Sequence, residues 1–418
     1  MTTSPQAQSD LGLGDGFDFT DPGLLARGLP VEEFARLRRT SPVWWNAQDP
    51  DNGGGFRDGG FWVISKYAHI REISRDPQTW SSNLNGCVMR YANDIPAEQL
   101  EAAKILMHNS DPPVHTRLRK LISRIFTPRS VAQLEQSLTA SAREIVNAAA
   151  EKSEGDFVVD VAHKLPLKAI ADLVGFPEAD HERLFHWSNI IMAAEDPDCV
   201  DDPMLAMTEL MGYSYEIAVE RKKSPAEDII TRLVTADSDG DELSEIEFGY
   251  FVLLLVVAGN ETTRNATSAG MLALLNHPDQ WEVYKRIRPA TAADEIIRWA
   301  SPVNAFQRTA RRDTEIGGVR IRQGQRVGLF YGSANYDEDI FAAPFTFSIQ
   351  REPNPHLGFG GTGPHYCIGA NLARKELTIM FNTIADLIPN IEITGPPTRM
   401  RHGWINGITA MPVRFNAR

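Results

Sequence analysis

One cysteine lies in a segment that could hold a reactive sulfur. Residues 356–374 read HLGFGGTGPHYCIGANLAR, and Cys367 stands between a glycine-rich loop and a helix predicted to begin at Ala370. Four glycines surround it: Gly360, Gly361, Gly363 and Gly369. Glycine permits positive φ and close approach of the backbone, and the helix would direct its free N–H groups and its positive end at the sulfur. Such surroundings stabilise a thiolate.

A thiolate can be a nucleophile, a redox sensor or a metal ligand, and a buried inert cysteine is the plain alternative. Nucleophilic catalysis needs a histidine base built across the fold, whereas His365 lies two residues away on the same loop. The loop also matches GxGxxG from Gly358, but in a dinucleotide fingerprint the helix follows directly, and here Cys367 intervenes. Metal ligation by Cys367 therefore fits best.

A long helix predicted over residues 244–276 carries polar groups in its middle. It begins with an S-x-x-E capping box at Ser244, and its first half is apolar almost all round. Residues 258–263 then read A-G-N-E-T-T. A threonine inside a helix commonly donates to the carbonyl four residues earlier, here from Thr262 to Ala258. Buried polar atoms need partners or a function, so this stretch is a second candidate for chemistry.

The helix predicted over residues 115–125 has a basic edge. Between residues 112 and 134 there are five basic residues and no acidic one: Arg117, Arg119, Lys120, Arg124 and Arg129. His115 and Arg119 lie one turn apart, so together they suit a pair of carboxylates. For any one of them alone, a solvated charge is the plain alternative. Nucleic-acid binding would need interleaved aromatic side chains or a known module, and neither is found.

The elements that must position these groups are mostly helices. Helical periodicity covers residues 29–40, 67–75, 115–125, 130–152, 165–173, 180–194, 204–223, 244–276, 279–287, 292–299 and 370–387. Short strands are predicted at 61–64, 306–310, 319–321 and 326–331, with two more near Ile391 and Ile408. The predicted fold class is mainly α with a minor β-sheet region.

The composition restricts the class of protein. The 418 residues include 42 Lys+Arg and 55 Asp+Glu, a formal net charge of −13, which disfavours general nucleic-acid binding. Three widely spaced cysteines, Cys87, Cys199 and Cys367, favour a reducing compartment and predict a cytoplasmic protein. The longest strongly apolar run, 251–258, is too short for a membrane span, and no secretory signal is visible. We expect residues 1–15 to be disordered and 16–418 to form one domain.

The loop around Cys367 resembles the haem-thiolate signature of the cytochrome P-450 monooxygenases. Three other segments agree in order along the chain. Residues 258–262 resemble the oxygen-activating motif of the long central helix, residues 295–298 resemble the Glu-x-x-Arg pair, and residues 306–308 resemble the strand that contacts the haem propionates. One feature departs from the family, because Phe359 stands eight residues before Cys367 instead of the usual seven.

The resemblance implies the cytochrome P-450 fold, with the long helix crossing a haem b (iron protoporphyrin IX) whose iron is bound by Cys367. A thiolate ligand favours cleavage of the O–O bond. Thr262 and Glu261 would relay protons to dioxygen. By spacing alone Glu295 and Arg298 would form an exposed ion pair, whereas the resemblance buries them as a structural anchor. It also assigns the propionate contacts to His115, Arg119, Arg308 and His365, and further cofactor contacts to Ala258, Gly259, Phe359, Gly360 and Gly369.

Without a flavin domain such an enzyme needs a reductant. The basic edge between residues 112 and 134 is therefore interpreted as a docking surface for an acidic ferredoxin, supplied by an NAD(P)H-dependent reductase. The alternative is that these charges only balance the propionates.

Five segments narrow the resemblance to the actinobacterial steroid 26/27-monooxygenases: residues 16–22, 53–62, 185–189, 258–265 and 402–407. This implies oxidation of the terminal side-chain methyl of cholesterol or cholest-4-en-3-one to alcohol, aldehyde and acid. The predicted apolar channel consists of Val88, Met89, Tyr91, Ile191, Val257, Val303, Phe306, Trp404 and Ile405. Methyl-branched fatty lipids are the alternative substrate. A non-catalytic haem-thiolate sensor and a peroxide-driven enzyme are alternatives of other kinds.

Overall fold

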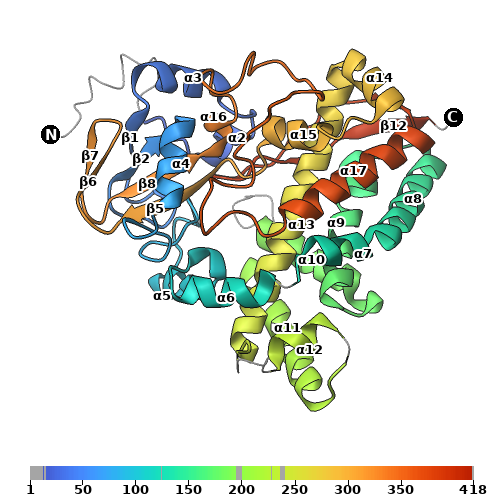
Figure 1. Cartoon of the computed structure of the whole chain (residues 1–418), viewed down its shortest axis with the longest axis horizontal. Coiled ribbons are helices and arrows are strands. Elements are labelled where there is room, and N and C mark those ends of the chain that lie inside the picture. Colours follow the sequence, from blue (N-terminus) through green and yellow to red (C-terminus); the bar gives the residue numbers. More distant parts are fainter. Residues whose placement is uncertain are drawn as a thin grey trace.

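The computed structural model describes residue 13 and residues 16–123, 125–193, 200–226, 228–235 and 241–416. This part of the chain is mainly helical with small sheets, which confirms the predicted fold class (Figure 1). The disorder expected for residues 1–15 concerns positions that, apart from Leu13, lie outside the described residues.

The largest sheet joins the N-terminal part of the chain to its second half. Its strands, in hydrogen-bonded order, are β1 (Val43–Ala47), β2 (Gly60–Ile64), β8 (Arg326–Phe330), β5 (Ala305–Ala310) and β3 (Trp80–Ser81). β2 and β8 are parallel, and the other neighbours are antiparallel. Figure 1 shows the blue N-terminal strands beside the orange ones of the second half. Because Arg308 pairs with Val327 inside this sheet, its backbone position is set by strands from both parts of the chain.

The other strands form small sheets. One contains β4 (Glu154–Asp156), β12 (Pro412–Asn416) and β9 (Asn390–Ile393), a second contains β10 (Thr398–Arg399) and β11 (Ile408–Ala410), and a third contains β6 (Thr314–Ile316) and β7 (Val319–Ile321). The strands predicted near Ile391 and Ile408 are both present. They lie in different sheets, since β9 pairs with β12 and β11 pairs with β10.

Helix α13 (Glu245–Asn276) runs through the middle of the molecule (Figure 1). Its capping box is confirmed: the Ser244 side chain accepts from the N–H of Glu247, and the Glu247 carboxylate accepts from the N–H of Ser244 at 3.0 Å. Among the described helices, α13 alone is long and apolar enough to cross a bilayer, and more than half of its most apolar stretch is buried inside the protein. This burial is that of a core helix.

Among the α-helices, five pack most extensively against α13: α9 (Lys164–Val174), α10 (His181–Met192), α11 (Pro203–Lys223), α15 (Ala292–Ala300) and α17 (Ala370–Leu387). The remaining α-helices are α2 (Pro22–Leu25), α3 (Val31–Thr40), α4 (Tyr67–Arg75), α5 (Ala97–Ala102), α6 (Val114–Ser123), α7 (Pro128–Gln133), α8 (Glu135–Lys152), α12 (Ile229–Val234), α14 (Pro278–Ile287) and α16 (Tyr331–Ala334). The single helix predicted over residues 130–152 is wrong. The N–H of Leu134 donates to the carbonyl of Val131, only three residues back, at 3.2 Å, and this tight turn separates α7 from α8.

Candidate active site

The cysteine loop ends at the first turn of α17. The N–H of Cys367 donates to the carbonyl of Phe359 at 3.0 Å, which closes the loop between them. Within it, Gly360 and Gly363 have φ values of +86° and +149°, which residues with a Cβ rarely adopt. Burial raises the pKa of the Cys367 thiol, and the N–H of Gly369 with the nearby arginine charges acts in the opposite direction.

Helix α4 packs closely against the loop before Cys367. A Cβ on Gly361 would lie 2.2 Å from Ser74 Oγ, and a Cβ on Gly363 would lie 2.0 Å from the carbonyl oxygen of Ser74. Arg75 Nε donates to Thr362 Oγ1 at 2.6 Å. Gly361 is therefore needed for close packing, and its φ is not positive. Gly369, the N-cap of α17, has a φ of −84° and also lacks a positive φ.

The thiol of Cys367 faces an internal cavity. The Cys367 side chain is accessible, and it opens onto this cavity. The volume of the cavity that the centre of a water molecule can occupy is about 290 Å³. All the residues predicted to be catalytic or to bind the cofactor line it: His115, Arg119, Ala258, Gly259, Glu261, Thr262, Arg308, Phe359, Gly360, His365, Cys367 and Gly369. Segments far apart in the sequence thus meet at one site.

Two arginines carry unpaired charge into the cavity. Arg308 is only 5% exposed, and its guanidinium makes one hydrogen bond among the described residues, from Nη1 to the carbonyl of Gln307 at 2.7 Å. Arg119 has no ion pair in the part of the chain that the structure describes. Burial, together with both arginine charges, lowers the pKa of His115 to about 4. The same causes lower the pKa of His365, whose ring lies 4.2 Å from that of His115.

Buried cations without a counter-ion are costly, so this end of the cavity is built for an anionic group. The two neutral imidazoles can serve as hydrogen-bond partners, and His365 Nε2 already lies 3.1 Å from Ser82 Oγ. Cys367, two residues after His365, offers the same cavity a thiol for a metal. A cofactor with carboxylates at its edge and a metal at its centre fits this arrangement.

The polar stretch of α13 lies on the cavity wall. The predicted bond from Thr262 Oγ1 to the carbonyl of Ala258 is confirmed, at 2.7 Å. Glu261 is 1% exposed and forms an ion pair with Arg264, while its Oε1 has no hydrogen-bond partner among the described residues. Burial raises the pKa of Glu261 in spite of the arginine. Arg264 Nη1 also donates to Asn189 Oδ1 at 3.1 Å.

Sequence reasoning missed several of these groups. Arg264 stands three residues after Glu261, the spacing of a helical ion pair, and this could have revealed it. Glu376 of α17 also lines the cavity, and no sequence pattern points to it. Gly259 borders the cavity, and a Cβ there would lie 2.7 Å from Ile170 of α9, which also lines the cavity.

Most of the cavity lining is apolar. Five of the nine predicted channel residues line it: Val257, Val303, Phe306, Trp404 and Ile405. The rings of Phe306 and Trp404 lie 5.5 Å apart, and Val303 forms a β-bridge with Ile405. Met192, at the end of α10, joins them in place of its neighbour Ile191.

The other four predicted channel residues do not line the cavity. Met89 is fully buried in a separate cluster that includes Phe61 and Phe330. Ile191 packs against the main helical core, and Val88 is buried outside the cavity wall. Tyr91 packs near Phe56, with ring centroids 6.1 Å apart. Their apolar character is satisfied by ordinary core contacts.

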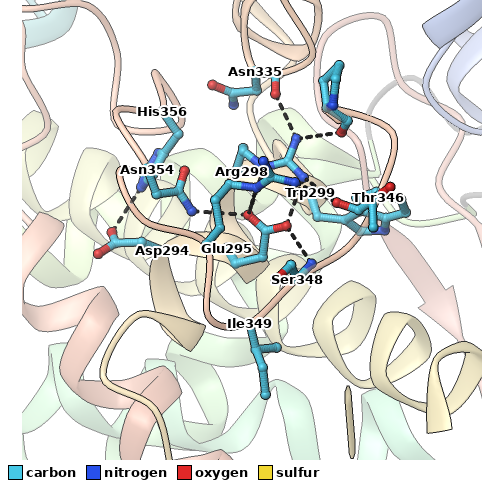
Figure 2. A network of polar contacts seen from close by, with 12 residues as sticks. Asp294, Glu295, Arg298, Trp299, Asn335, Thr346, Ser348, Ile349, Asn354 and His356 are labelled. Atoms are coloured by element: carbon cyan, nitrogen blue, oxygen red, sulfur yellow. Dashed lines mark hydrogen bonds and ion pairs between the residues drawn. The ribbon is translucent and has the colours of Figure 1, made fainter. Parts of the chain in front are cut away.

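Glu295 and Arg298 form the centre of a buried network, not an exposed pair. Both side chains are 0% exposed, and two hydrogen bonds of 2.8 Å join them. Arg298 Nη1 donates to the carbonyl of Asn335 at 2.8 Å, and the N–H of Ser348 donates to Glu295 at 2.9 Å. Figure 2 shows how these contacts tie α15 to the loops before the cysteine. Arg351 also donates to Glu295, at 3.0 Å, a contact that the sequence did not reveal.

The predicted basic edge is partly neutralised. Arg117 donates to the Glu247 carboxylate, and Lys120 lies 4.0 Å from Asp241. Arg119 points into the cavity, and Arg124 lies outside the described residues. Arg129 of α7 is exposed, and α7 packs against α17, the helix that follows Cys367.

Comparison with known proteins identifies the class. The family model for Cytochrome P450 matches residues 290–386, a segment that contains the Glu295 network, Arg308 and Cys367. A solved structure of a Mycobacterium marinum cytochrome P450 in complex with pseudoionone has a TM-score of 0.87 and 37% identity, with 96% of this chain and 99% of that chain covered. The fold is therefore that of a cytochrome P450.

Two curated relatives add detail. A steroid C26-monooxygenase from Rhodococcus jostii (strain RHA1) is 55% identical over 403 residues, which cover 96% of this chain and 85% of the relative. A methyl-branched lipid omega-hydroxylase from Mycobacterium tuberculosis (strain ATCC 25618 / H37Rv) is 40% identical over 396 residues, which cover 92% and 90%. The chain belongs to the cytochrome P450 family, and its cofactor is haem.

Proposed function

We propose that this protein is a steroid monooxygenase that hydroxylates the terminal side-chain methyl of cholesterol or cholest-4-en-3-one and oxidises it further to the aldehyde and the acid. The observation that carries this proposal is one cavity whose lining combines a thiol and unpaired cations with many apolar side chains. The 55% identity to a steroid C26-monooxygenase over nearly the whole chain supports the sterol as substrate.

In this proposal the unpaired charges bind the cofactor. Cys367 would hold the iron, and the guanidiniums of Arg119 and Arg308 with the rings of His115 and His365 would hold the two propionates. Bound in this way, haem supplies the activation of dioxygen. Arg119 is carried by α6 and Arg308 by β5, so the packing of these two elements sets where the propionates would bind.

Two residues of α13 would deliver protons to the cavity. Glu261 Oε1, which has no hydrogen-bond partner among the described residues, would take up and release a proton, and burial raises the pKa of this carboxyl, which favours proton uptake. Thr262 Oγ1, which donates to the carbonyl of Ala258, would pass its proton into the cavity and receive another from Glu261. Arg264 keeps the other oxygen of Glu261 in place.

The apolar residues would orient the substrate. A sterol side chain is a branched hydrocarbon, and Met192, Val257, Phe306, Trp404 and Ile405 offer it a dry surface. Because these residues exclude water, they also protect the reaction from solvent.

Product analysis tests the proposal. The holoenzyme, supplied with ferredoxin, its reductase and NAD(P)H, is incubated with cholest-4-en-3-one, and the products are identified by mass spectrometry. We expect the terminal alcohol, aldehyde and acid. Absence of side-chain oxidation, with turnover of methyl-branched fatty acids instead, would favour the second candidate, a methyl-branched lipid omega-hydroxylase, to which the chain is 40% identical. A sensor would turn over neither, and it would have no use for Glu261 and Thr262.

We propose that ferredoxin is the redox partner and that it docks near α7, where Arg129 is exposed beside α17. Arg129→Glu is expected to raise the KM for ferredoxin, more strongly at low salt, because exposed charges act mainly on the rate of association. Arg232→Glu on α12 is the control. Equal KM values for both variants and the parent would contradict this docking site.

We also propose a cytoplasmic location and a single domain formed by residues 16–418. The free thiols of Cys87 and Cys367 support the first; Cys199 lies outside the described residues. The packing of helices from both halves of the chain against α13 supports the second.

A further inference from the structure

One carboxylate beside the Glu295 network joins three segments around the cysteine loop. Asp294 Oδ1 accepts a hydrogen bond from His356 Nε2 at 2.9 Å and another from Arg374 Nε at 2.7 Å. Asp294 belongs to α15, His356 precedes the glycine-rich loop, and Arg374 belongs to α17. Figure 2 shows Asp294 and His356 facing each other beside, but separate from, the contacts of Glu295.

The tautomer of His356 follows from its second contact. The N–H of Gly358 donates to His356 Nδ1 at 3.1 Å, so Nδ1 is the acceptor and Nε2 carries the hydrogen that Asp294 receives. The neutral imidazole thus satisfies both contacts. Hydrogen bonds from His356 and Arg374 hold the pKa of Asp294 below its usual range, against the effect of burial, so this carboxylate is ionised.

Both partners of Asp294 contact Phe359. The guanidinium carbon of Arg374 lies 4.5 Å from the centroid of the Phe359 ring, a cation–π distance. The His356 ring lies 5.6 Å from the same centroid on a plane tilted by 48°. The carbonyl of Phe359 in turn accepts the N–H of Cys367 at 3.0 Å. Asp294 is thereby connected to the backbone N–H of Cys367, first through His356 or Arg374 and then through Phe359.

Nothing in the Glu295 network requires this carboxylate. Glu295 has its own side-chain partners, among them Arg298, Arg351 and Asn354, and no side-chain hydrogen bond among the described residues joins these three to the Asp294 carboxylate. The side chains of Asp294 and Arg374 are 30% and 33% exposed, so solvent weakens their pairing and an ordinary ion pair there would stabilise the fold little. Its place beside Phe359 points to a role at the sulfur.

We propose that Asp294 is a positioning residue for the Cys367 thiolate, because its contacts with His356 and Arg374 hold Phe359 in place. The charges of Asp294 and Arg374 together set the reduction potential of the iron. This inference rests on the proposed ligation of haem iron by Cys367. Reduction adds an electron, so a nearby negative charge opposes it and a nearby positive charge favours it. The two members of the pair should therefore act with opposite sign.

Redox titration of the holoenzyme tests the inference. Asp294→Asn keeps an acceptor for both partners and removes the charge, so the potential should rise. Arg374→Gln removes the cation, so the potential should fall. For each we expect at least about a threefold change in the equilibrium constant of one-electron reduction, which is about 30 mV. The control pair is Arg288 and Asp386, joined at 2.7 Å near the far end of α17, and its Gln and Asn variants should leave the potential unchanged.

The outcomes separate the inference from the proposed function. Shifts of the reduction potential in opposite directions for Asp294→Asn and Arg374→Gln support the inference. Shifts of the same sign, or no shift while the carbon-monoxide complex keeps the red-shifted Soret band of thiolate ligation, overturn it. Absence of that band in the parent protein would instead refute ligation by Cys367. If Asp294→Asn does not retain haem, the reduction potentials of Arg374→Lys and Arg374→Gln are compared instead. Lysine keeps the positive charge and glutamine removes it, so the inference requires a lower potential for Arg374→Gln. Equal potentials for the two variants overturn the inference.

Discussion

Replacing Glu376 by glutamine should remove a pH-dependent cost from the folded state. Glu376 lies on α17 against the cavity and is 3% exposed. Its Oε2 has no hydrogen-bond partner among the described residues. Burial alone raises the pKa of this carboxyl from 4.5 to about 8.

The sign of the effect follows from proton binding. The unfolded chain releases the proton above about pH 4.5, whereas the folded protein keeps it up to about pH 8. Between these values the folded state binds one more proton, so its stability is greatest at the acid end and falls as the pH rises. The slope approaches about 1.4 kcal/mol per pH unit, and from pH 5 to pH 8 the loss amounts to about 3 kcal/mol.

Urea unfolding of the holoenzyme at pH 5, 6.5 and 8 measures this loss. Glutamine has nearly the same shape and does not titrate, so the free energy of unfolding of Glu376→Gln minus that of the parent should increase by about 3 kcal/mol over the range. Glu98→Gln, at an exposed position of α5, is the matched control and should show no such increase. A difference that stays constant with pH would refute the reasoning, because it would mean that Glu376 is ionised in the folded protein.

Three further variants test the site. Thr262→Ala should consume NAD(P)H at a similar rate but form less hydroxylated product, because the cavity loses a hydroxyl that passes protons; unchanged coupling would show another route. Arg298→Ala should lower the free energy of unfolding by about 3–5 kcal/mol, since it leaves Glu295 as a buried charge without its main partner, and urea titration measures this. Arg308→Gln should release haem faster to apomyoglobin, because a buried guanidinium no longer faces the propionates; an unchanged release rate would argue against that contact.

The unpaired arginines explain how the fold prepares its site. Arg308 lies on β5 and Arg119 on α6, so their charges are brought together by the packing of separate elements. The folded chain carries the cost of burying these charges until an anionic group binds. Cofactor binding should therefore stabilise the protein, and the apoprotein should be the less stable form.

The local elements followed from the sequence because their causes lie within a few residues. The Ser244 capping box and the bond from Thr262 to Ala258 each span three or four positions, so spacing alone predicts them. The glycines before Cys367 and the helix after it are likewise neighbours in the chain. The chemistry expected of the cysteine rests on this local pattern.

Which residues meet across the molecule was decided by the tertiary structure. The sequence shows that Met89 and Ile191 are apolar, but an apolar residue can pack in the core or on a cavity wall, and only the tertiary structure distinguishes the two. The contact of Asp294 with Arg374 joins positions 80 residues apart, and no local signal encodes such a pair. The sequence by itself determined the kinds of groups and the helices and strands that carry them, whereas the packing of those elements determined which charges, rings and carboxylates face one another.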